Sequence, residues 1–179
     1  MTRSSLLSAS MLCGLFLIGS CDAAEWKEFT SKPGGFKVLM PGTPTEETQA
    51  VNGEKLVIYG AETEQAYYAA TYTEMPFTVE RLAKDTEKVL DGSRRGMLES
   101  VNGKLLKETR LKLDGKHSGR ELQAEINLPG KTGVVRARIY VVDRLLINLS
   151  AVGTAEAVAS PDVEKFLNSL ALTKATPAK

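Results

Sequence analysis

The second half of the 179-residue chain contains four extended segments that follow one another through very short links. These segments occupy residues 104–113, 119–128, 133–142 and 145–152. Turn residues fill the links, namely Asp114-Gly115 with its neighbours, residues 129–132 and Asp143-Arg144. Parallel neighbours need a crossover of a dozen or more residues, so links this short make adjacent strands antiparallel. A four-stranded antiparallel meander is therefore the feature that most restricts the fold of this chain.

Alternating polarity gives the two central strands of this meander an apolar side and a charged side. The apolar side carries Leu122, Ala124, Ile126, Leu128, Val135, Ala137, Ile139 and Val141. The charged side carries Glu121, Gln123, Glu125, Arg136, Arg138 and Tyr140, and we expect Glu108, Arg110, Lys112, Asn148 and Ser150 to extend it. If residues 129–132 close a simple hairpin, Glu125 falls opposite or nearly opposite Arg136 or Arg138.

Two interpretations of this charged side are open. In the first it is a solvated face with cross-strand ion pairs, each worth a few tenths to about 1 kcal/mol. In the second it binds a protein partner or an anionic ligand, because arginine forks match carboxylate and phosphate groups. The binding residues would then be Arg136, Arg138, Tyr140, Glu121 and Glu125.

The first half combines strands with one long helix. Its expected strands are residues 26–29, 36–40, 48–51, 54–61 and 66–73, with a hairpin turn at Asn52-Gly53. Thr78 can cap a helix that runs to about Glu99, and its apolar stripe is Val79, Leu82, Ala83, Val89, Leu90 and Met97. Ser160-Pro161 starts a second helix over residues 161–170. We therefore expect one α+β domain over residues 26–172, an antiparallel sheet packed by a long central helix and a short C-terminal helix.

The N-terminus has the layout of a bacterial secretory signal of the lipoprotein type. Arg3 precedes the apolar run 11–18, which is too short to span a bilayer, and Gly19-Ser20-Cys21 then resembles a lipobox. We expect residues 1–20 to be the signal peptide and Cys21 to carry lipid, so that the protein is exported and anchored to the cell membrane, facing the periplasm or the cell exterior. In the alternative, a non-lipidating peptidase cuts after Ala23 or Ala24. Residues 21–25 would form a tether, and residues 173–179 a disordered tail.

Several turn and packing motifs resemble those of the PsbP-like family. They are the opening Trp26, the strand 35–38, the turn 41–44, the strand start 119–122 and the closing helix 166–170. That family consists of small exported bacterial domains related in fold to the extrinsic PsbP protein of photosystem II. The resemblance implies an antiparallel sheet sandwiched by helices. It implies no reaction, because the fold is used chiefly for docking and assembly.

Signatures of enzymes and cofactors are scarce in the sequence. His117 is the single histidine and lies in a glycine-containing turn, and Cys21 would be the only cysteine of the exported chain. No Gly-x-Ser-x-Gly, Gly-x-Gly-x-x-Gly or Walker motif is present. We therefore expect no metal and no cofactor. A cage built from Tyr59, Tyr67, Tyr68 and Tyr72 is disfavoured, because adjacent Tyr67 and Tyr68 must point to opposite faces of a strand.

Charge balance also restricts the partners. The chain has 23 basic and 22 acidic residues, and loss of Arg3 with the signal leaves 22 of each. This balance gives no support for nucleic-acid binding. The leading hypothesis is a lipid-anchored, non-enzymatic domain of the cell envelope that docks a protein partner. The alternatives are a small-ligand carrier with a pocket between helix and sheet, and an unrecognised enzyme in which Glu121 and Glu125 converge.

Overall fold

The computed structural model describes residues 25–51, 53–128 and 130–173. The predicted signal peptide, Cys21 and most of the predicted tail lie outside these residues. The strands before the long helix are β1 (Trp26–Ser31), β2 (Phe36–Pro41), β3 (Thr45–Val51), β4 (Glu54–Glu62) and β5 (Ala66–Glu74). The long helix is α1 (Val79–Ser100). The later elements are β6 (Lys104–Leu113), β7 (His117–Leu128), β8 (Lys131–Val142), β9 (Leu145–Gly153), α2 (Ala155–Val158), α3 (Pro161–Asn168) and β10 (Ala171–Leu172).

Within the described residues the strands form two antiparallel sheets. The large sheet has seven strands in the order β3-β4-β5-β9-β8-β7-β6, and the small sheet has three in the order β1-β2-β10. The meander predicted from the short links is present as β6 to β9, with every neighbouring pair antiparallel. β9 also pairs with β5, and this pairing joins the meander to the strands of the first half.

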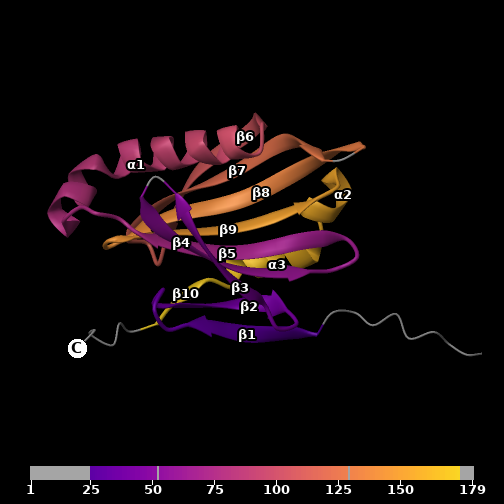
Figure 1. Cartoon of the computed structure of the whole chain (residues 1–179), viewed down its shortest axis with the longest axis horizontal. Helices are drawn as coiled ribbons and strands as arrows, with labels where there is room; N and C mark the ends of the chain where they lie inside the picture. Colours follow the sequence, from indigo (N-terminus) through magenta and orange to yellow (C-terminus); the bar gives the residue numbers. More distant parts are fainter. Residues whose placement is uncertain (1–24, 52, 129, 174–179) are drawn as a thin grey trace, which may run out of the picture.

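The large sheet is the middle layer of the molecule. α1 lies on one side of it, and the small sheet with α3 lies on the other (Figure 1). We call these the α1 side and the α3 side of the large sheet. This arrangement is the predicted α+β class, in which an antiparallel sheet is packed by a long helix and a short C-terminal helix.

The long helix α1 begins and ends as its sequence predicts. The Thr78 side chain accepts a hydrogen bond from the Arg81 N–H (3.3 Å), and Asn102 takes the left-handed conformation just beyond the C-terminus (φ 47°). The start of the predicted apolar stripe is correct at Leu82, which is buried, but wrong at Val79 and Ala83, which are exposed. α1 packs mainly on β7 and β8, and the residues it contributes to the hydrophobic clusters come from its later turns.

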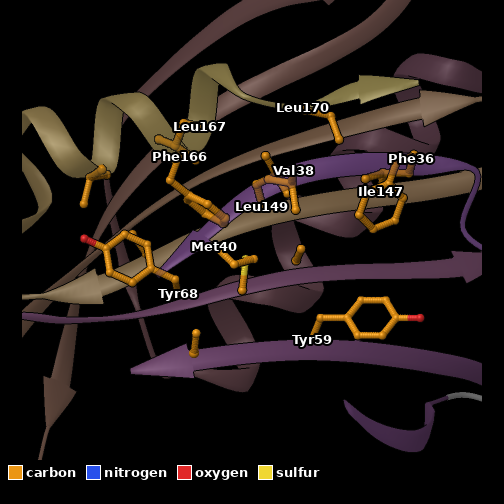
Figure 2. Close-up of a cluster of buried hydrophobic side chains, with 14 of the residues drawn as sticks. Phe36, Val38, Met40, Tyr59, Tyr68, Ile147, Leu149, Phe166, Leu167 and Leu170 are labelled. Carbon is orange, nitrogen blue, oxygen red and sulfur yellow. The ribbon is translucent and has the colours of Figure 1, made fainter. Parts of the chain in front are cut away.

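The two sides of the large sheet have separate hydrophobic cores. On the α1 side Leu90 packs with Leu122, Ile139 and Val141. A second group on this side, which includes Ala124, Ile126, Val135 and Ala137, receives Met97. On the α3 side a larger core joins β2, β4, β5, β9 and α3 (Figure 2), and its main members are Phe36, Val38, Met40, Tyr59, Tyr68, Ile147, Leu149, Phe166 and Leu167.

The short helix α3 places Phe166 in the centre of the larger core. The Ser160 hydroxyl accepts a hydrogen bond from the Val163 N–H, and Pro161 occupies the first turn, as the sequence predicts. The Phe166 ring has no exposed surface and meets the Tyr68 ring edge-on, with centroids 5.3 Å apart. α3 therefore closes the core rather than lying on its surface.

We expect Phe166→Ala to lower the free energy of unfolding by about 3–5 kcal/mol, because the truncation leaves a cavity in a close-packed core. Chemical denaturation of both proteins measures the difference. Leu106→Ala is the control: that side chain is 51% exposed, and its loss should change stability by less than about 0.5 kcal/mol. Equal midpoints for Phe166→Ala and the wild type would show that α3 is peripheral to the core.

Candidate functional site

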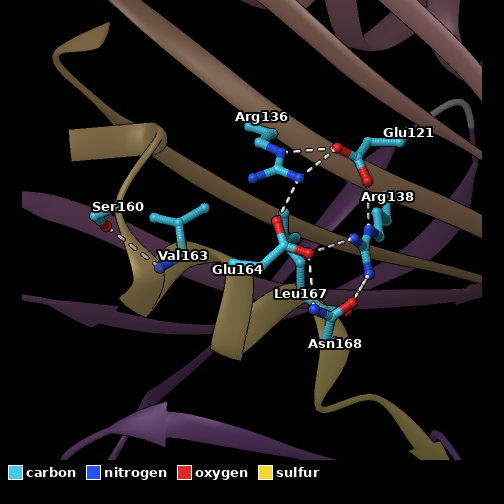
Figure 3. Close-up of polar contacts among 8 residues, drawn as sticks. All are labelled: Glu121, Arg136, Arg138, Ser160, Val163, Glu164, Leu167 and Asn168. Atoms are coloured by element: carbon cyan, nitrogen blue, oxygen red, sulfur yellow. Dashed lines mark hydrogen bonds and ion pairs between the residues drawn. The ribbon is translucent and has the colours of Figure 1, made fainter. Parts of the chain in front are cut away.

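The charged residues predicted on the meander meet on the α3 side of the large sheet. Glu121 comes from β7 and Arg138 lies directly opposite it on β8. The Arg138 Nε donates to Glu121 Oε2 (2.6 Å), while the Arg136 Nε and Nη2 both lie within 2.8 Å of Glu121 Oε1. One carboxylate therefore accepts hydrogen bonds from two arginines (Figure 3).

Helix α3 supplies the remaining partners of these arginines. Glu164 Oε2 accepts from the Arg136 Nη2 (2.6 Å), and its Oε1 lies 3.2 Å from the Arg138 Nη2. The Arg138 Nη1 donates to the Leu167 carbonyl (3.0 Å) and to the Asn168 Oδ1 (2.7 Å), as Figure 3 shows. We call Glu121, Arg136, Arg138, Glu164 and Asn168 the arginine clasp, because it ties α3 to β7 and β8.

Each charged side chain of the clasp has partners of opposite charge. The side chains of Arg136 and Arg138 are 19% and 12% exposed. Burial works against the charge on Arg136, but the hydrogen bonds and charges of Glu121 and Glu164 outweigh it and raise the pKa of Arg136. Burial would likewise raise the pKa of Glu164, but Arg136, Asn168 and Arg138 together lower it. Every charged member has at least two partners, so the geometry is that of a structural ion-pair network.

Two residues predicted for this face do not join the clasp. Tyr140 is buried in the core on the α3 side, and burial raises its pKa although the neighbouring Arg138 acts to lower it. Glu125 is exposed and lies opposite Val134, so the expected pairing of Glu125 with Arg136 or Arg138 is wrong. The hairpin register instead places Glu121 opposite Arg138. The pairing of β7 with β8 continues to Leu128 and Lys131, so the strands extend further toward the turn than the predicted link 129–132 allows.

The expected extension of the charged face onto the flanking strands is also wrong. Asn148 pairs with Ile139 and Ser150 with Ala137, which places both on the α1 side. On β6, Arg110 pairs with Arg120 and Glu108 with Leu122, and Lys112 follows the same alternation. The reason is register, since a shift of one residue moves every side chain of a strand to the opposite face. Ile147 and Leu149 therefore occupy the α3 side, and this face is covered rather than solvated.

A second charged cluster, which the sequence patterns did not predict, lies on the α1 side. Arg120 of β7 is only 5% exposed and bonds Glu87 and Asp91 of α1 and Glu108 of β6. Arg94 of α1 also reaches Glu108 (2.8 Å). Burial lowers the pKa of Arg120, but Glu108, Glu87 and Asp91 together outweigh burial and raise it. Arg120 stands in the same alternation as the core residues Leu122, Ala124 and Ile126, and an arginine in such a series is the signal that could have revealed it.

The four tyrosines of the disfavoured cage lie on opposite sides of the large sheet. Tyr59 and Tyr68 belong to the core on the α3 side and Tyr72 packs against it. Tyr67 points to the α1 side and is 42% exposed. His117 is half-buried at the start of β7. Within residues 25–51, 53–128 and 130–173, no group of three or more His, Cys, Asp or Glu side chains is placed to hold a metal ion.

Comparison with known proteins identifies the fold. No protein-family model and no curated protein sequence matches the chain. The solution structure of cyanobacterial PsbP (CyanoP) from Synechocystis sp. PCC 6803 aligns with a TM-score of 0.54 at 12% identity, covering 88% of this chain and 98% of that one. A protein of unknown function from Pseudomonas aeruginosa aligns with a TM-score of 0.39 at 12% identity over 78% of this chain and 90% of that one. The chain has a PsbP-like fold, as the sequence motifs suggested.

We expect Arg138→Ala to loosen α3, because Leu167, Asn168, Glu164 and Glu121 each lose a charged donor. Hydrogen bonds to charged groups contribute about 1.5–3 kcal/mol, so a loss of stability in this range is expected. Faster hydrogen exchange of the α3 amides is the more specific readout. Arg144→Ala serves as the control, because the Arg144–Glu74 pair is half exposed and contributes at most about 1 kcal/mol. Unchanged exchange in α3 would show that the clasp does not hold the helix.

Proposed function

We propose that this chain is an exported, lipid-tethered domain of the cell envelope that docks a protein partner without catalysing a reaction. One observation carries the docking role. α1 packs mainly on β7 and β8, and no described element packs substantially on the α1 side of β3 and β4. The α1 side of β3, β4 and the adjoining β5 is therefore left without a covering layer, and we call this surface the uncovered half-face.

The side chains of the uncovered half-face support the docking proposal. Its half-buried side chains include Leu56 and Ile58 of β4 and Thr71 and Thr73 of β5, with the Tyr67 ring exposed among them. Tyrosine is among the residues that are enriched in protein interfaces relative to the rest of the surface. The surface is built on paired strands, and such a rigid surface loses little conformational entropy on binding.

The carrier alternative receives less support from the described residues. It would need an apolar pocket between α1 and the large sheet, but Leu90 fills that space against Leu122, Ile139 and Val141. The clefts beside the two arginine clusters are lined mainly by polar and charged side chains. In the enzyme alternative Glu121 and Glu125 would converge, whereas Glu121 is held by two arginines and Glu125 is exposed and lies four residues further along β7.

The tether rests on Cys21, which lies outside the described residues. Among those residues, no helix has the length and apolarity to cross a membrane. The lipobox-like Gly19-Ser20-Cys21 and the absence of a cysteine partner after signal removal support lipidation. The PsbP-like fold is compatible with this role, since the resemblance associates such domains with docking at a surface.

We expect Cys21→Ser to shift the protein from the membrane fraction to the soluble fraction, or to leave it unprocessed. Two or three acyl chains hold a protein on a bilayer, and none can be attached without the thiol. Intact-mass spectrometry of the wild-type protein provides the direct measurement. A mature form that starts at Ala24 or Glu25 and carries no lipid would contradict the tether.

Docking can be tested with a photoreactive residue placed on the uncovered half-face. We expect Tyr67→p-benzoylphenylalanine to crosslink one defined protein in the native membrane, whereas the same residue at Lys88, on the exposed surface of α1, does not. Position-dependent capture separates docking from chance collision. The proposal fails if the two positions capture the same proteins in the same amounts, or if neither captures any.

A further inference from the structure

The two end strands of the large sheet differ in how they are protected. Edge strands expose unpaired main-chain groups, which proteins commonly protect with charged side chains, above all lysine, or with prolines or bulges. β6 follows this rule: it carries exposed Lys104, Lys107 and Lys112, and a register shift interrupts its pairing between Leu105 and Lys107. β3 has no lysine, arginine or proline, its charged residues are Glu46 and Glu47, and it keeps a continuous register with β4 over seven pairs. All seven of its residues are exposed.

The hairpin turn determines which main-chain groups of β3 are unpaired. Val51 and Glu54 are the pair of the β3–β4 register nearest the turn, and the pair that closes a tight hairpin exchanges main-chain hydrogen bonds. In an antiparallel ladder, residues that bond the partner strand alternate with residues that do not. The N–H and C=O groups of Glu46, Thr48 and Ala50 therefore point away from β4. They form a row to which a further strand can bind.

The side chains of β3 indicate what charge the added strand would carry. Glu46 and Glu47 lie on opposite sides of the large sheet, and neither forms an ion pair with another described residue. The Glu47 carboxylate accepts only the amide of Gln49 (2.9 Å) among the described side chains. By contrast, the carboxylates beneath α1 and beside α3 are bound by arginines. Cations on the incoming strand would therefore meet unpaired carboxylates on both sides.

The Tyr67 ring adds an aromatic surface next to β3. A side chain at Gly60 would clash with the Tyr67 hydroxyl, so the ring reaches across β4 toward β3. Burial raises the pKa of Tyr67, and the nearby Glu47 and Glu62 raise it further. A half-exposed ring near two carboxylates suits a lysine or arginine side chain, because the cation gains both ion-pair and cation–π energy.

From these contacts we infer that β3 accepts an eighth strand, an extended segment of the partner protein that contains lysine or arginine. Binding by strand addition takes affinity from main-chain hydrogen bonds and selectivity from alternate side chains. A second copy of this chain is a poorer occupant, because pairing β3 with β3 would bring four carboxylates into one short ladder. The inference rests on the proposed docking function and specifies the segment that docks.

The test uses the mature protein purified from its membrane and two labelled seven-residue probes, one alternating lysine with threonine and one alternating glutamate with threonine. Fluorescence anisotropy measures binding to the wild type, Thr48→Pro and Thr48→Val. Proline removes the outward N–H without breaking a bond to β4, whereas valine keeps that N–H and the β-branched shape. We expect the lysine probe to bind the wild type and Thr48→Val alike, and Thr48→Pro about tenfold or more weakly.

Circular dichroism shows whether Thr48→Pro is folded. If it is not, a second variant still tests the inference. Glu46→Lys with Glu47→Lys keeps the strand and reverses its charge, and it should also lose the lysine probe. The inference is overturned if the lysine probe fails to bind the wild type, if Thr48→Pro binds it equally well, or if the glutamate probe binds as tightly. A dimer in sedimentation equilibrium that Thr48→Pro dissolves would assign the edge to a second copy instead and also overturn it.

The outcome remains distinct from that of the docking proposal. If crosslinking from Tyr67 still captures its partner in Thr48→Pro, the domain docks but not through β3. If neither the wild type nor the variant captures a partner, docking itself fails. Capture that is lost in Thr48→Pro and kept in Thr48→Val supports strand addition.

Discussion

Hydrophobic packing on both sides of the large sheet holds the layers of this protein together. The two cores are offset along the sheet: one lies beneath α1 over β7 and β8, and the other joins β2, β4, β5 and β9 to α3. The central strands β8 and β9 contribute to both, since Ile139 packs toward α1 while Ile147 and Leu149 pack toward α3. Each layer therefore depends on these strands being paired in the correct register.

The offset explains the positions of the charged clusters. Arg120 lies where α1 and the edge strand β6 meet over the sheet, and the arginine clasp joins α3 to β7 and β8. At the edge of each contact between a helix and the sheet, apolar packing ends, and side chains of the strands face polar groups of the helix. An arginine suits these places, because its long stem covers apolar surface while its planar head bonds several carboxylates. Both clusters connect helices to the sheet.

The same offset leaves the α1 side of β3 and β4 without a layer. Covering it would require a second long helix, and the described chain has only α1 on that side. The proposed docking surface and the proposed strand addition both follow from this geometry. The arginine pair that stood out in the sequence has a different role in the structure, because Glu164 and Asn168 occupy the bonds that a ligand would have needed.

Local patterns in the sequence determined most of the elements, the antiparallel meander, the N-terminal caps of α1 and α3 and the fold class, because short links and alternation act between neighbouring residues. They also predicted correctly that Tyr67 and Tyr68 point to opposite faces. They did not reveal α2 or β10, and they did not divide the strands between two sheets. Only the tertiary structure decided that β9 presents Leu149 rather than Asn148 beside Arg138, and that α3 covers the clasp. A register shift of one residue reverses the faces of a whole strand, and contacts across 26 residues, such as that between Arg138 and Glu164, leave no local periodicity in the sequence.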